Sequence, residues 1–325
     1  MYRSILVPLD GSPLGEQAVP AAVALCRLTA ARLHLVHVRT VDWLLGRGED
    51  MPDERSYLEA VCGGVSNDLG ESVSFALLPH DEPRRLGPNP APAEVAARLT
   101  DYARTNGIGL IVMATHGRGG FSRLYFGSVV EALLATVETP LLLIRPTVEA
   151  DPDRWKGTHP LRRILVPVAG AMAEAIIDAA HDLGSSTGAS FTLLRVVALP
   201  TPAYEPLAPV ASIASPQDLD AARRAAEEEL QRLAEPLRKA GHQTTIDIAV
   251  GHSPANAILE CARSGQYDAI TLGTHARRGI DRMLLGSVAN KVLRAADCPT
   301  LVVPPAATAE EREPRADQSS TPESR

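Results

Sequence analysis

A glycine-containing loop in the first half of the chain has the residue types of an anion-binding site. His116 and Gly117 follow an apolar segment, and Gly127 and Ser128 stand directly before the apolar-periodic run that starts at Val129. Glycine lets the backbone approach a phosphate closely, and the unpaired N–H groups at the start of a helix favour negative charge. This spacing predicts a phosphate-binding loop that ends at the first turn of a helix.

Ser128 and Asp10 each have two explanations. Ser128 and Glu131 form the pattern of a capping box, in which the serine side chain caps the helix without any ligand. Asp10 ends the first apolar segment, before a Gly-Ser pair. Its carboxylate would either accept a hydrogen bond from a ligand amine or cap a helix that starts near Pro13. The residues alone leave these alternatives open.

Recognised catalytic motifs are missing from the sequence. It has no Gly-x4-Gly-Lys-Ser/Thr phosphate loop, no Gly-Lys dipeptide and no Gly-x-Ser-x-Gly nucleophile motif. We therefore expect no catalytic residue and assign His116 and His275 to ligand positioning or structure. His34 and His37 are three residues apart in an expected strand and point to opposite faces, which disfavours a shared metal ion, and no metal site is expected.

Short apolar runs that alternate with longer amphipathic runs predict the elements that hold this loop. Such a pattern is typical of a parallel sheet with helices on both faces, in which ligands bind beyond the carboxyl ends of the strands. Strands are expected at residues 4–9, 32–38, 73–78, 110–114 and 140–144. One helix should run from Pro13 to about Thr29 and another over residues 93–106, ended by Gly107.

The chain contains this pattern twice. Ile5 matches Ile164 and Gly127 matches Gly286, and both pairs lie 159 positions apart. One domain has therefore been duplicated head to tail. In the second repeat a long helix is expected from Pro216, closed by Gly241. In the first repeat the equivalent stretch, residues 53–70, is shorter and should be broken at its Gly-Gly pair.

The domain organisation and the class of protein follow from composition. We expect a first domain at 1–146, a linker at 147–160, a second domain at 161–305 and a disordered tail at 306–325. The 325 residues are 45% hydrophobic and 22% charged, and no apolar run is long enough for a membrane span. The net charge of −7 gives no footprint for nucleic acid. Four cysteines without metal or redox spacing, and no secretory signal, indicate a cytoplasmic protein.

The segments ILVPLDGS, RLHLVHV, THGRGGFSRLYFGSVVEALL and TPLLLIRP resemble the universal stress protein family, whose ATP-binding members carry Gly-x2-Gly-x9-Gly-Ser/Thr. The resemblance covers nearly the whole chain, twice. It implies two tandem Rossmann-like α/β domains of the adenine nucleotide alpha hydrolase type, each with about five mostly parallel strands. The residues that it implies for nucleotide binding are Pro8, Leu9, Asp10, Val38, Met113, Ala114, His116, Gly117, Arg118, Gly127, Ser128 and Val129. Within this set Asp10 contacts adenine, Pro8, Leu9 and Val38 line the base pocket, and the loop residues from His116 onward hold ribose and phosphates.

Both repeats depart from the family pattern. Ala114 stands where the first glycine of the motif would be. The second repeat keeps Gly273, His275, Gly286 and Ser287. It has Ala276 in place of the central glycine and Ala169 in place of the adenine-reading aspartate. We expect the second repeat to be a weak site or a structural copy.

Three functions are compatible with these residues. The leading one is a regulatory protein of the stress response that binds ATP or another adenine nucleotide, with or without Mg²⁺. The alternatives are a slow ATP hydrolase and a nucleotide-free interaction scaffold. The apolar last strands of the two repeats should pair within one chain, since an open edge strand exposes unpaired backbone groups. A homodimer of the whole chain stays open.

Overall fold

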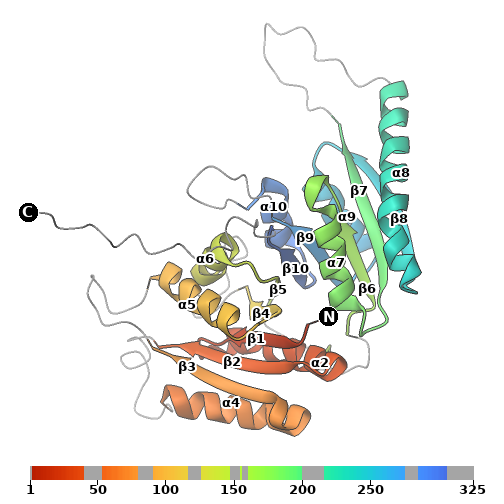
Figure 1. Cartoon of the computed structure of the whole chain (residues 1–325). Helices are drawn as coiled ribbons and strands as arrows, with labels where there is room; N and C mark the ends of the chain where they lie inside the picture. The colour runs from red at the N-terminus through yellow and green to blue at the C-terminus, as the bar shows by residue number, and fades with distance from the viewer. Residues whose placement is uncertain are drawn as a thin grey trace, which may run out of the picture.

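The computed structural model describes residues 2–39, 53–79, 91–115, 126–146, 154–155, 160–199, 216–274 and 285–305 (Figure 1). The first repeat contains β1 (Ser4–Pro8), α1 (Pro13–Glu16), α2 (Val19–Thr29), β2 (Arg32–Val38), α4 (Glu54–Leu69), η1 (Gly70–Ser72), β3 (Val73–Leu78), α5 (Pro92–Thr105), β4 (Leu110–Ala114), α6 (Ser128–Thr136) and β5 (Leu141–Ile144). The second contains β6 (Arg163–Pro167), η2 (Gly170–Met172), α7 (Ala173–Gly184), β7 (Ser190–Ala198), α8 (Pro216–Lys239), β8 (Thr244–Gly251), α9 (Pro254–Ser264), β9 (Ala269–Gly273), α10 (Ser287–Ala295) and β10 (Thr300–Val303). The predicted α/β fold with mostly parallel strands in each repeat is confirmed.

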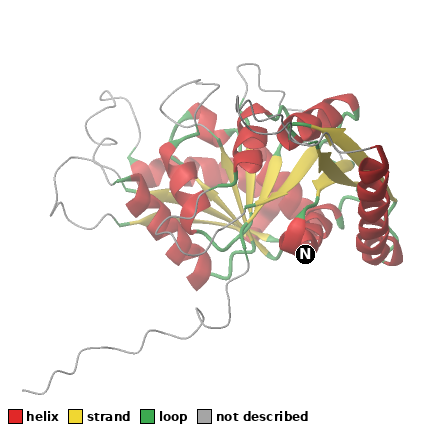
Figure 2. Cartoon of the chain, turned by 90° about the horizontal axis from the view of Figure 1, so that it is seen from above, coloured by secondary structure: helices red, strands yellow, loops and turns green. Residues whose placement is uncertain are grey.

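The strands of both repeats form one sheet in the order β3-β2-β1-β4-β5-β10-β9-β6-β7-β8. Strands within a repeat are parallel, and helices lie on either side of the sheet (Figure 2). The chain leaves β1 toward β2 on one side and returns to β4 on the other side. The gap between the carboxyl ends of β1 and β4 is therefore the topological switch point of the first repeat, and that between β6 and β9 is its counterpart.

The two repeats meet through β5 and β10, the only antiparallel pair in the described sheet. Leu142 faces Leu301 in this pair, and these residues lie 159 positions apart, as do the other matched residues of the repeats. A pseudo-twofold axis therefore passes between Leu142 and Leu301. The predicted intramolecular pairing of the repeats is confirmed.

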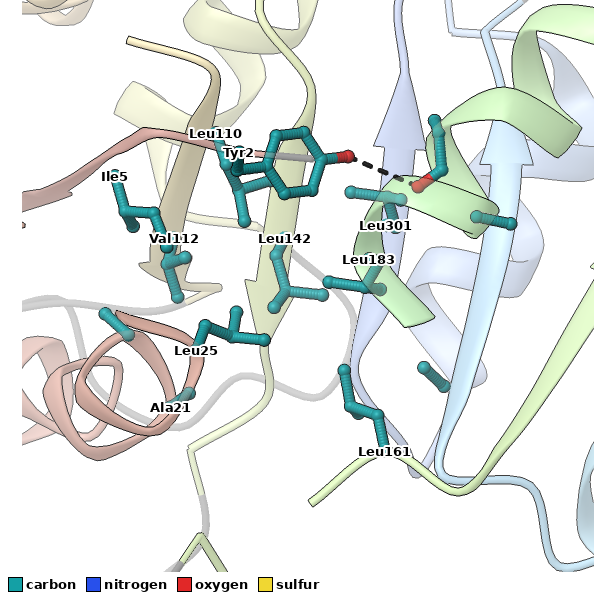
Figure 3. Close-up of a cluster of buried hydrophobic side chains, with 14 of the residues drawn as sticks. Tyr2, Ile5, Ala21, Leu25, Leu110, Val112, Leu142, Leu161, Leu183 and Leu301 are labelled. Carbon is teal, nitrogen blue, oxygen red and sulfur yellow. Dashed lines mark hydrogen bonds between the residues drawn. The ribbon is translucent and has the colours of Figure 1, made fainter. Parts of the chain in front are cut away.

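Both faces of the sheet are covered by apolar side chains, as the continuous apolar runs predict. In β4, Leu110 and Val112 belong to the core layer under α2 and α7, whereas Ile111 and Met113 belong to the layer under α5 and α6. The first layer is continuous across the junction of the repeats, where Leu25, Leu142, Leu183 and Leu301 lie close together (Figure 3). This shared core holds the two domains as one body.

Tyr2 adds a polar contact across the junction. Its hydroxyl donates a hydrogen bond to the carbonyl oxygen of Ala179 in α7, over 3.3 Å (Figure 3). Burial, followed by the charge of Asp182, raises the pKa of Tyr2 well above its usual value. The phenol therefore stays neutral and keeps its proton for this bond.

The helix expected from Pro13 to Thr29 is interrupted. It ends at Glu16 as α1 and resumes at Val19 as α2. Pro20 stands in the first turn of α2, where its missing N–H is harmless, but inside one continuous helix its ring would collide with the carbonyl group one turn earlier. Proline therefore sets the boundary.

The break expected at Gly63 and Gly64 is wrong. The helix α4 runs through both glycines without interruption. Asp53 caps it by accepting hydrogen bonds from the N–H groups of Arg55 and Ser56 at 2.9 and 3.0 Å. The apolar stripe that includes Leu58 and packs on the sheet outweighs the cost of two exposed helical glycines, about 1 kcal/mol each.

Candidate functional site

The start of α6 is fixed directly at the carboxyl end of β4. The N–H of Thr115 donates to the carbonyl oxygen of Ile144 at 2.9 Å, and the N–H of Gly127 donates to the carbonyl oxygen of Thr115 at 2.8 Å. These two bonds close the loop whose ends are Thr115 and Gly127. His116, Gly117 and Arg118 lie outside the described residues.

Ser128 does not cap this helix. Gly127 occupies the N-cap position, no side chain of the described residues makes a capping hydrogen bond there, and Ser128 is the exposed first residue of α6. A serine has to stand one residue earlier, in extended backbone, for its oxygen to reach the N–H groups of the first turn. The capping-box explanation of Ser128 is therefore wrong. The first turn of α6 presents backbone N–H groups at the switch point.

The backbone conformation at Gly127 does not require glycine. Its φ is −58°, and a Cβ atom there would come no closer than 3.5 Å to the Thr115 oxygen. Alanine would therefore fit among the described residues. A bound phosphate, which approaches such a position closely, is a physical reason for glycine here, so this turn fits the nucleotide that the sequence predicts.

Asp10 is held over the start of α1. Its Oδ1 atom accepts hydrogen bonds from the N–H and the hydroxyl of Ser12, at 2.9 and 2.6 Å, and the Ser12 oxygen accepts one from the N–H of Gly15 at 3.0 Å. A Cβ atom on Gly15 would lie 2.6 Å from Asp10 Oδ1, so a larger residue there would displace the Asp10 carboxylate. The helix cap is thus Ser12, and Asp10 orients it. A carboxylate has about four acceptor positions and can therefore take part in several hydrogen bonds at once.

The remaining predicted residues divide between the two faces of the sheet. Val38 and Met113 are buried in the layer under α5 and α6. Pro8 alternates with Leu9 along β1, and Leu9 is buried in the opposite layer with Val7. The structure therefore brings Val38 and Met113 to one face and places the Leu9 side chain on the other. Ala114 is buried at the end of β4, and Val129 is half-buried in the first turn of α6.

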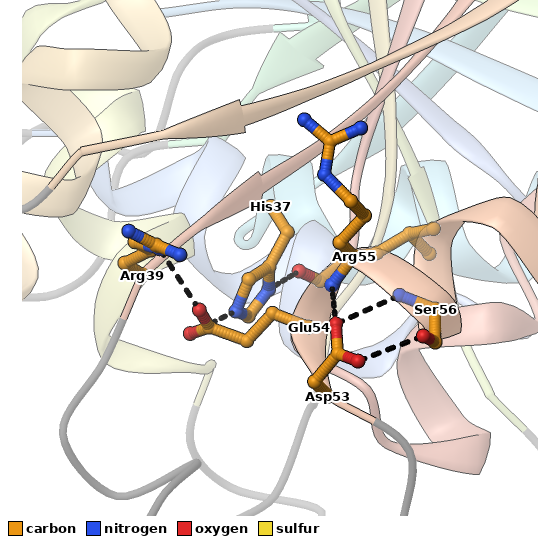
Figure 4. A network of polar contacts seen from close by, with 7 residues as sticks. His37, Arg39, Asp53, Glu54, Arg55 and Ser56 are labelled. Carbon is orange, nitrogen blue, oxygen red and sulfur yellow. Dashed lines mark hydrogen bonds and ion pairs between the residues drawn. The ribbon is translucent and has the colours of Figure 1, made fainter.

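A buried polar network beneath the end of β1 escaped the sequence analysis (Figure 4). His37 Nδ1 lies 2.7 Å from the carbonyl oxygen of Leu9, and His37 Nε2 lies 3.3 Å from Glu54 Oε1. Arg39 Nε donates to Glu54 Oε2 at 3.1 Å. No sequence pattern indicates this contact. It follows from the β1–β2 register of the structure, in which Val36 lies opposite Pro8 and His37 therefore lies beside Leu9.

His34 points away from this network, as predicted. Its Nδ1 atom lies 3.1 Å from the hydroxyl of Tyr102 in α5, on the opposite face from His37. Burial, followed by the charge of Arg32, lowers the pKa of His34.

The corresponding end of β6 is built differently. Ala169 is exposed and offers no side-chain cap to η2. At the end of the neighbouring strand β9, a Cβ atom on Gly273 would lie 2.8 Å from Ile176 Cδ1 and 3.3 Å from Met172 Cε, so apolar side chains pack closely there. Gly286 again stands at an N-cap without a side-chain bond. His275 and Ala276 lie outside the described residues.

The four cysteines form no disulfide. Burial raises the pKa of Cys26 to about 12 and that of Cys298 to about 11, which keeps both as unreactive thiols at neutral pH. Among the described residues, no group of three or more metal-binding side chains is found, and no helix is both long and apolar enough to span a membrane.

A model of the universal stress protein family matches residues 1–145 and again residues 160–304. The chain belongs to the universal stress protein family. It is a tandem member with two such domains, and family members include a universal stress protein solved in complex with cAMP.

Relatives of this universal stress protein match it over different lengths. One from Mycolicibacterium smegmatis is 26% identical over 317 residues, which cover 93% of this chain and 97% of that protein. One from Methanocaldococcus jannaschii is 50% identical over only 50 residues, 15% of this chain and 29% of that protein. One from Mycobacterium tuberculosis is 27% identical over 201 residues, 59% of this chain and 61% of that protein. The matches to these last two span less than two thirds of their lengths.

Solved structures share the fold. A universal stress protein from Archaeoglobus fulgidus superposes with a TM-score of 0.61 at 16% identity, over 93% of this chain and 98% of that chain. A Pseudomonas aeruginosa protein gives a TM-score of 0.61 at 19% identity, over 94% of both chains.

Proposed function

We propose that the first repeat binds an adenine nucleotide, ATP in the first place, and that the protein acts as a nucleotide-dependent regulator in a stress response. The observation that carries this proposal is one of placement. The Asp10 carboxylate and the uncapped first turn of α6 stand at the carboxyl ends of β1 and β4, which are neighbouring strands. A hydrogen-bond acceptor for a base and a donor set for phosphates thus meet at one switch point.

Each part of the ligand has a partner of matching chemistry. The adenine amine donates to Asp10, and Pro8, Val38, Met113 and Ala114 lie around the base. Leu9 contributes its backbone alone, because its side chain is buried in the opposite core layer. The phosphates accept hydrogen bonds from the loop and from the first turn of α6, where Gly127, Ser128 and Val129 stand. The partial positive charge of that helix end favours the polyphosphate, and Mg²⁺ would accompany it as a phosphate-bound ion.

Binding, rather than catalysis, is the activity that these groups support. Hydrolysis needs a group that positions water and charges that stabilise the transition state, and binding alone does not accelerate chemistry. Any hydrolysis of ATP should therefore be slow. A nucleotide-free scaffold is the remaining alternative, and the Ala114 methyl group, where the motif has glycine, is the feature that favours it.

The second repeat serves as the structural partner of the first. We place the domains at 1–146 and 161–305, joined by the linker 147–160 and followed by the tail 306–325, in a cytoplasmic protein. Pairing of whole chains into a homodimer is a further proposal. Scattering in solution, which gives the mass of the particle, tests it directly.

The ligand released from the purified protein tests the function. The full chain is purified from cells without added nucleotide, denatured, and its released small molecules are separated by chromatography. Copurified ATP supports regulation, and ADP as the main product supports hydrolysis. If nothing is released and calorimetry detects no binding of added ATP, ADP or cAMP, the scaffold function replaces both.

A further inference from the structure

The start of α6 is contacted from the second repeat by Arg294 of α10. The Arg294 Nη2 atom lies 3.6 Å from Glu131 Oε1, and the Arg294 Cζ atom lies 5.3 Å from the centre of the Phe126 ring. Phe126 directly precedes the N-cap residue Gly127, and Glu131 stands in the first turn of α6. One side chain of the second repeat therefore contacts the proposed phosphate-binding turn on both sides of its N-cap.

Arg294 is itself held in place from both repeats. Its Nε atom donates a hydrogen bond to Asn290 Oδ1, one turn earlier in α10. Arg145 of the first repeat donates to the carbonyl oxygen of Ala296, at 2.8 Å, and to that of Arg294 at the end of α10. A cation is favourable at a helix C-terminus because it pairs with the last carbonyl groups. Arg145 thus fixes the end of α10, and Arg294 in turn contacts the start of α6.

The sequence does not provide the reciprocal contact, in which the first repeat would hold the start of α10. At the displacement of 159 positions, the counterparts of Arg294, Phe126 and Glu131 are Ala135, Leu285 and Asn290. These residues offer neither a guanidinium group, nor an aromatic ring, nor a carboxylate. The contact therefore occurs once, and it serves the repeat in which we place the nucleotide.

Electrostatics gives this contact a role beyond packing. A carboxylate in the first turn stabilises the helix, because it faces the positive end of the helix dipole, but it repels a phosphate bound at the same end. The positive charge of Arg294 offsets this repulsion by Glu131. The side chains of the pair are 31% and 52% exposed, so water screens their attraction in part. The contact with the Phe126 ring orders the residue that leads into the turn.

We propose that Arg294 of the second repeat is a positioning residue for the phosphates of a nucleotide bound to the first repeat. This inference rests on the proposed function. Arg294 acts through Glu131 and Phe126, so it strengthens the binding of ATP. It does not strengthen the binding of adenosine, which has no phosphate to place at the first turn of α6. The second repeat therefore completes the site of the first, although its own first strand ends without a polar cap.

Calorimetry on the full chain, with ATP titrated directly and adenosine measured by competition against ATP, tests the proposal. Arg294→Gln should lower the affinity for ATP by about three- to tenfold, within the range that one partly exposed ion pair and one cation–π contact supply together. The affinity for adenosine should stay the same, so the ratio of the two affinities reports on the phosphate-binding turn rather than on folding. Arg232→Gln is the matched control. Arg232 pairs with Glu174 at 3.8 Å within the second repeat, and its loss should change neither affinity.

Two variants of the first repeat sharpen the test. Glu131→Gln removes the repelling carboxylate, so in this background Arg294→Gln should reduce the ATP affinity by a smaller factor than it does alone. Phe126→Leu introduces the residue of the second repeat and should weaken ATP binding by about two- to fivefold, with adenosine binding unchanged. If Arg294→Gln does not fold, Phe126→Leu decides in the same way.

Two kinds of result would contradict the proposals separately. An unchanged ATP affinity in Arg294→Gln, or equal losses for ATP and adenosine, would overturn the role of Arg294 and leave nucleotide binding intact. Absence of binding of both ligands by the unchanged protein would overturn the proposed function itself.

Discussion

The two repeats have the same strand order but different strand ends. In the first, Asp10, Ser12 and Gly15 form a hydrogen-bonded turn at the end of β1. In the second, Ala169 offers no such bonds, and Ile176 packs against Gly273 at the end of β9. The strand order and the glycine N-caps of α6 and α10 are kept in both repeats. The two repeats therefore share one scaffold, whereas the polar turn at the end of the first strand, where we propose that the nucleotide binds, occurs only in the first repeat.

Removal of the Asp10 carboxylate is the strongest test of the difference between the two repeats. Asp10→Ala should weaken nucleotide binding about 5- to 150-fold, because an adenine amine left without an acceptor in a dry pocket costs about 1–3 kcal/mol. Calorimetry on the full chain should give about one tight site, and Ser287→Ala should leave its affinity unchanged.

Asp10→Asn separates ligand reading from helix capping. Its amide oxygen can still accept from Ser12, while its NH₂ group cannot accept from adenine. It should therefore melt like the unchanged protein and bind like Asp10→Ala. Two equal sites, or full binding by Asp10→Ala, would show that the repeats do not differ as described.

A second difference lies in the core and concerns stability. Gly184 in α7 and Cys26 in α2 are equivalent positions of the two repeats. Each stands four residues before a residue in the left-handed conformation, Gly188 with φ of 65° and Ala30 with φ of 54°. A Cβ atom on Gly184 would lie 2.7 Å from Phe191, whereas Leu33 occupies the position of Phe191 in the first repeat. The second repeat thus has the small Gly184 beside the large Phe191, where the first repeat has two residues of intermediate size, Cys26 and Leu33.

Gly184→Ala should therefore lower the free energy of unfolding by about 1–3 kcal/mol through overpacking. Urea unfolding of the full chain measures the change. Phe191→Leu, combined with Gly184→Ala, should recover part of the loss, because the pair then resembles the first repeat. Additive effects of the two substitutions would mean that the residues do not compensate each other.

Tyr2 tests the asymmetry of the junction with a smaller effect. Leu161 matches Tyr2 at the displacement of 159, so the hydrogen bond to Ala179 occurs once. Tyr2→Phe keeps the ring in the shared core and removes this bond, which should cost about 0.5–1.5 kcal/mol. Urea unfolding again gives the value. An unchanged midpoint would show that the bond contributes nothing.

The smallest expected effect is on the pH dependence of stability in the second repeat. Burial, followed by the charge of His181, lowers the pKa of His242. The unfolded chain then binds this proton more readily than the folded one. The contribution of neutral His242 is fully present above about pH 6.5 and is lost as the pH falls through its lowered pKa.

His181→Gln should reduce this loss, because it removes the charge that repels protonated His242. Thermal unfolding of the full chain, compared with and without the substitution from neutral to acidic pH, measures the difference. A steeper loss in His181→Gln would contradict the assigned cause.

Most of the fold could be predicted because the apolar runs are short, repeated and bounded by glycine and proline. The strand at 32–38 and the helix of the second repeat from Pro216 match the observed bounds. Tertiary packing decided the rest. The unbroken α4 depends on its contacts with the sheet, and the early end of α1 depends on Pro20, which the amphipathic pattern alone does not reveal.

The candidate site was less accessible from sequence. The family resemblance assigned Asp10 and Gly127 to one site, and the structure places the strands that precede them, β1 and β4, side by side. Whether Ser128 caps its helix depends on backbone angles at a single residue, which a sequence pattern does not specify. His37 could not be assigned from its neighbours along the chain, because both of its partners come from other elements.

The pseudo-twofold axis between Leu142 and Leu301 has an evolutionary consequence. In a symmetric homodimer every substitution appears in both subunits, so a site cannot be lost on one side alone. Here both domains belong to one chain, so each meets its partner at a high effective concentration, and each half is encoded separately. One domain can therefore lose ligand recognition and keep only its structural role, while the ligand affinity of the other domain can change without any change in its partner domain.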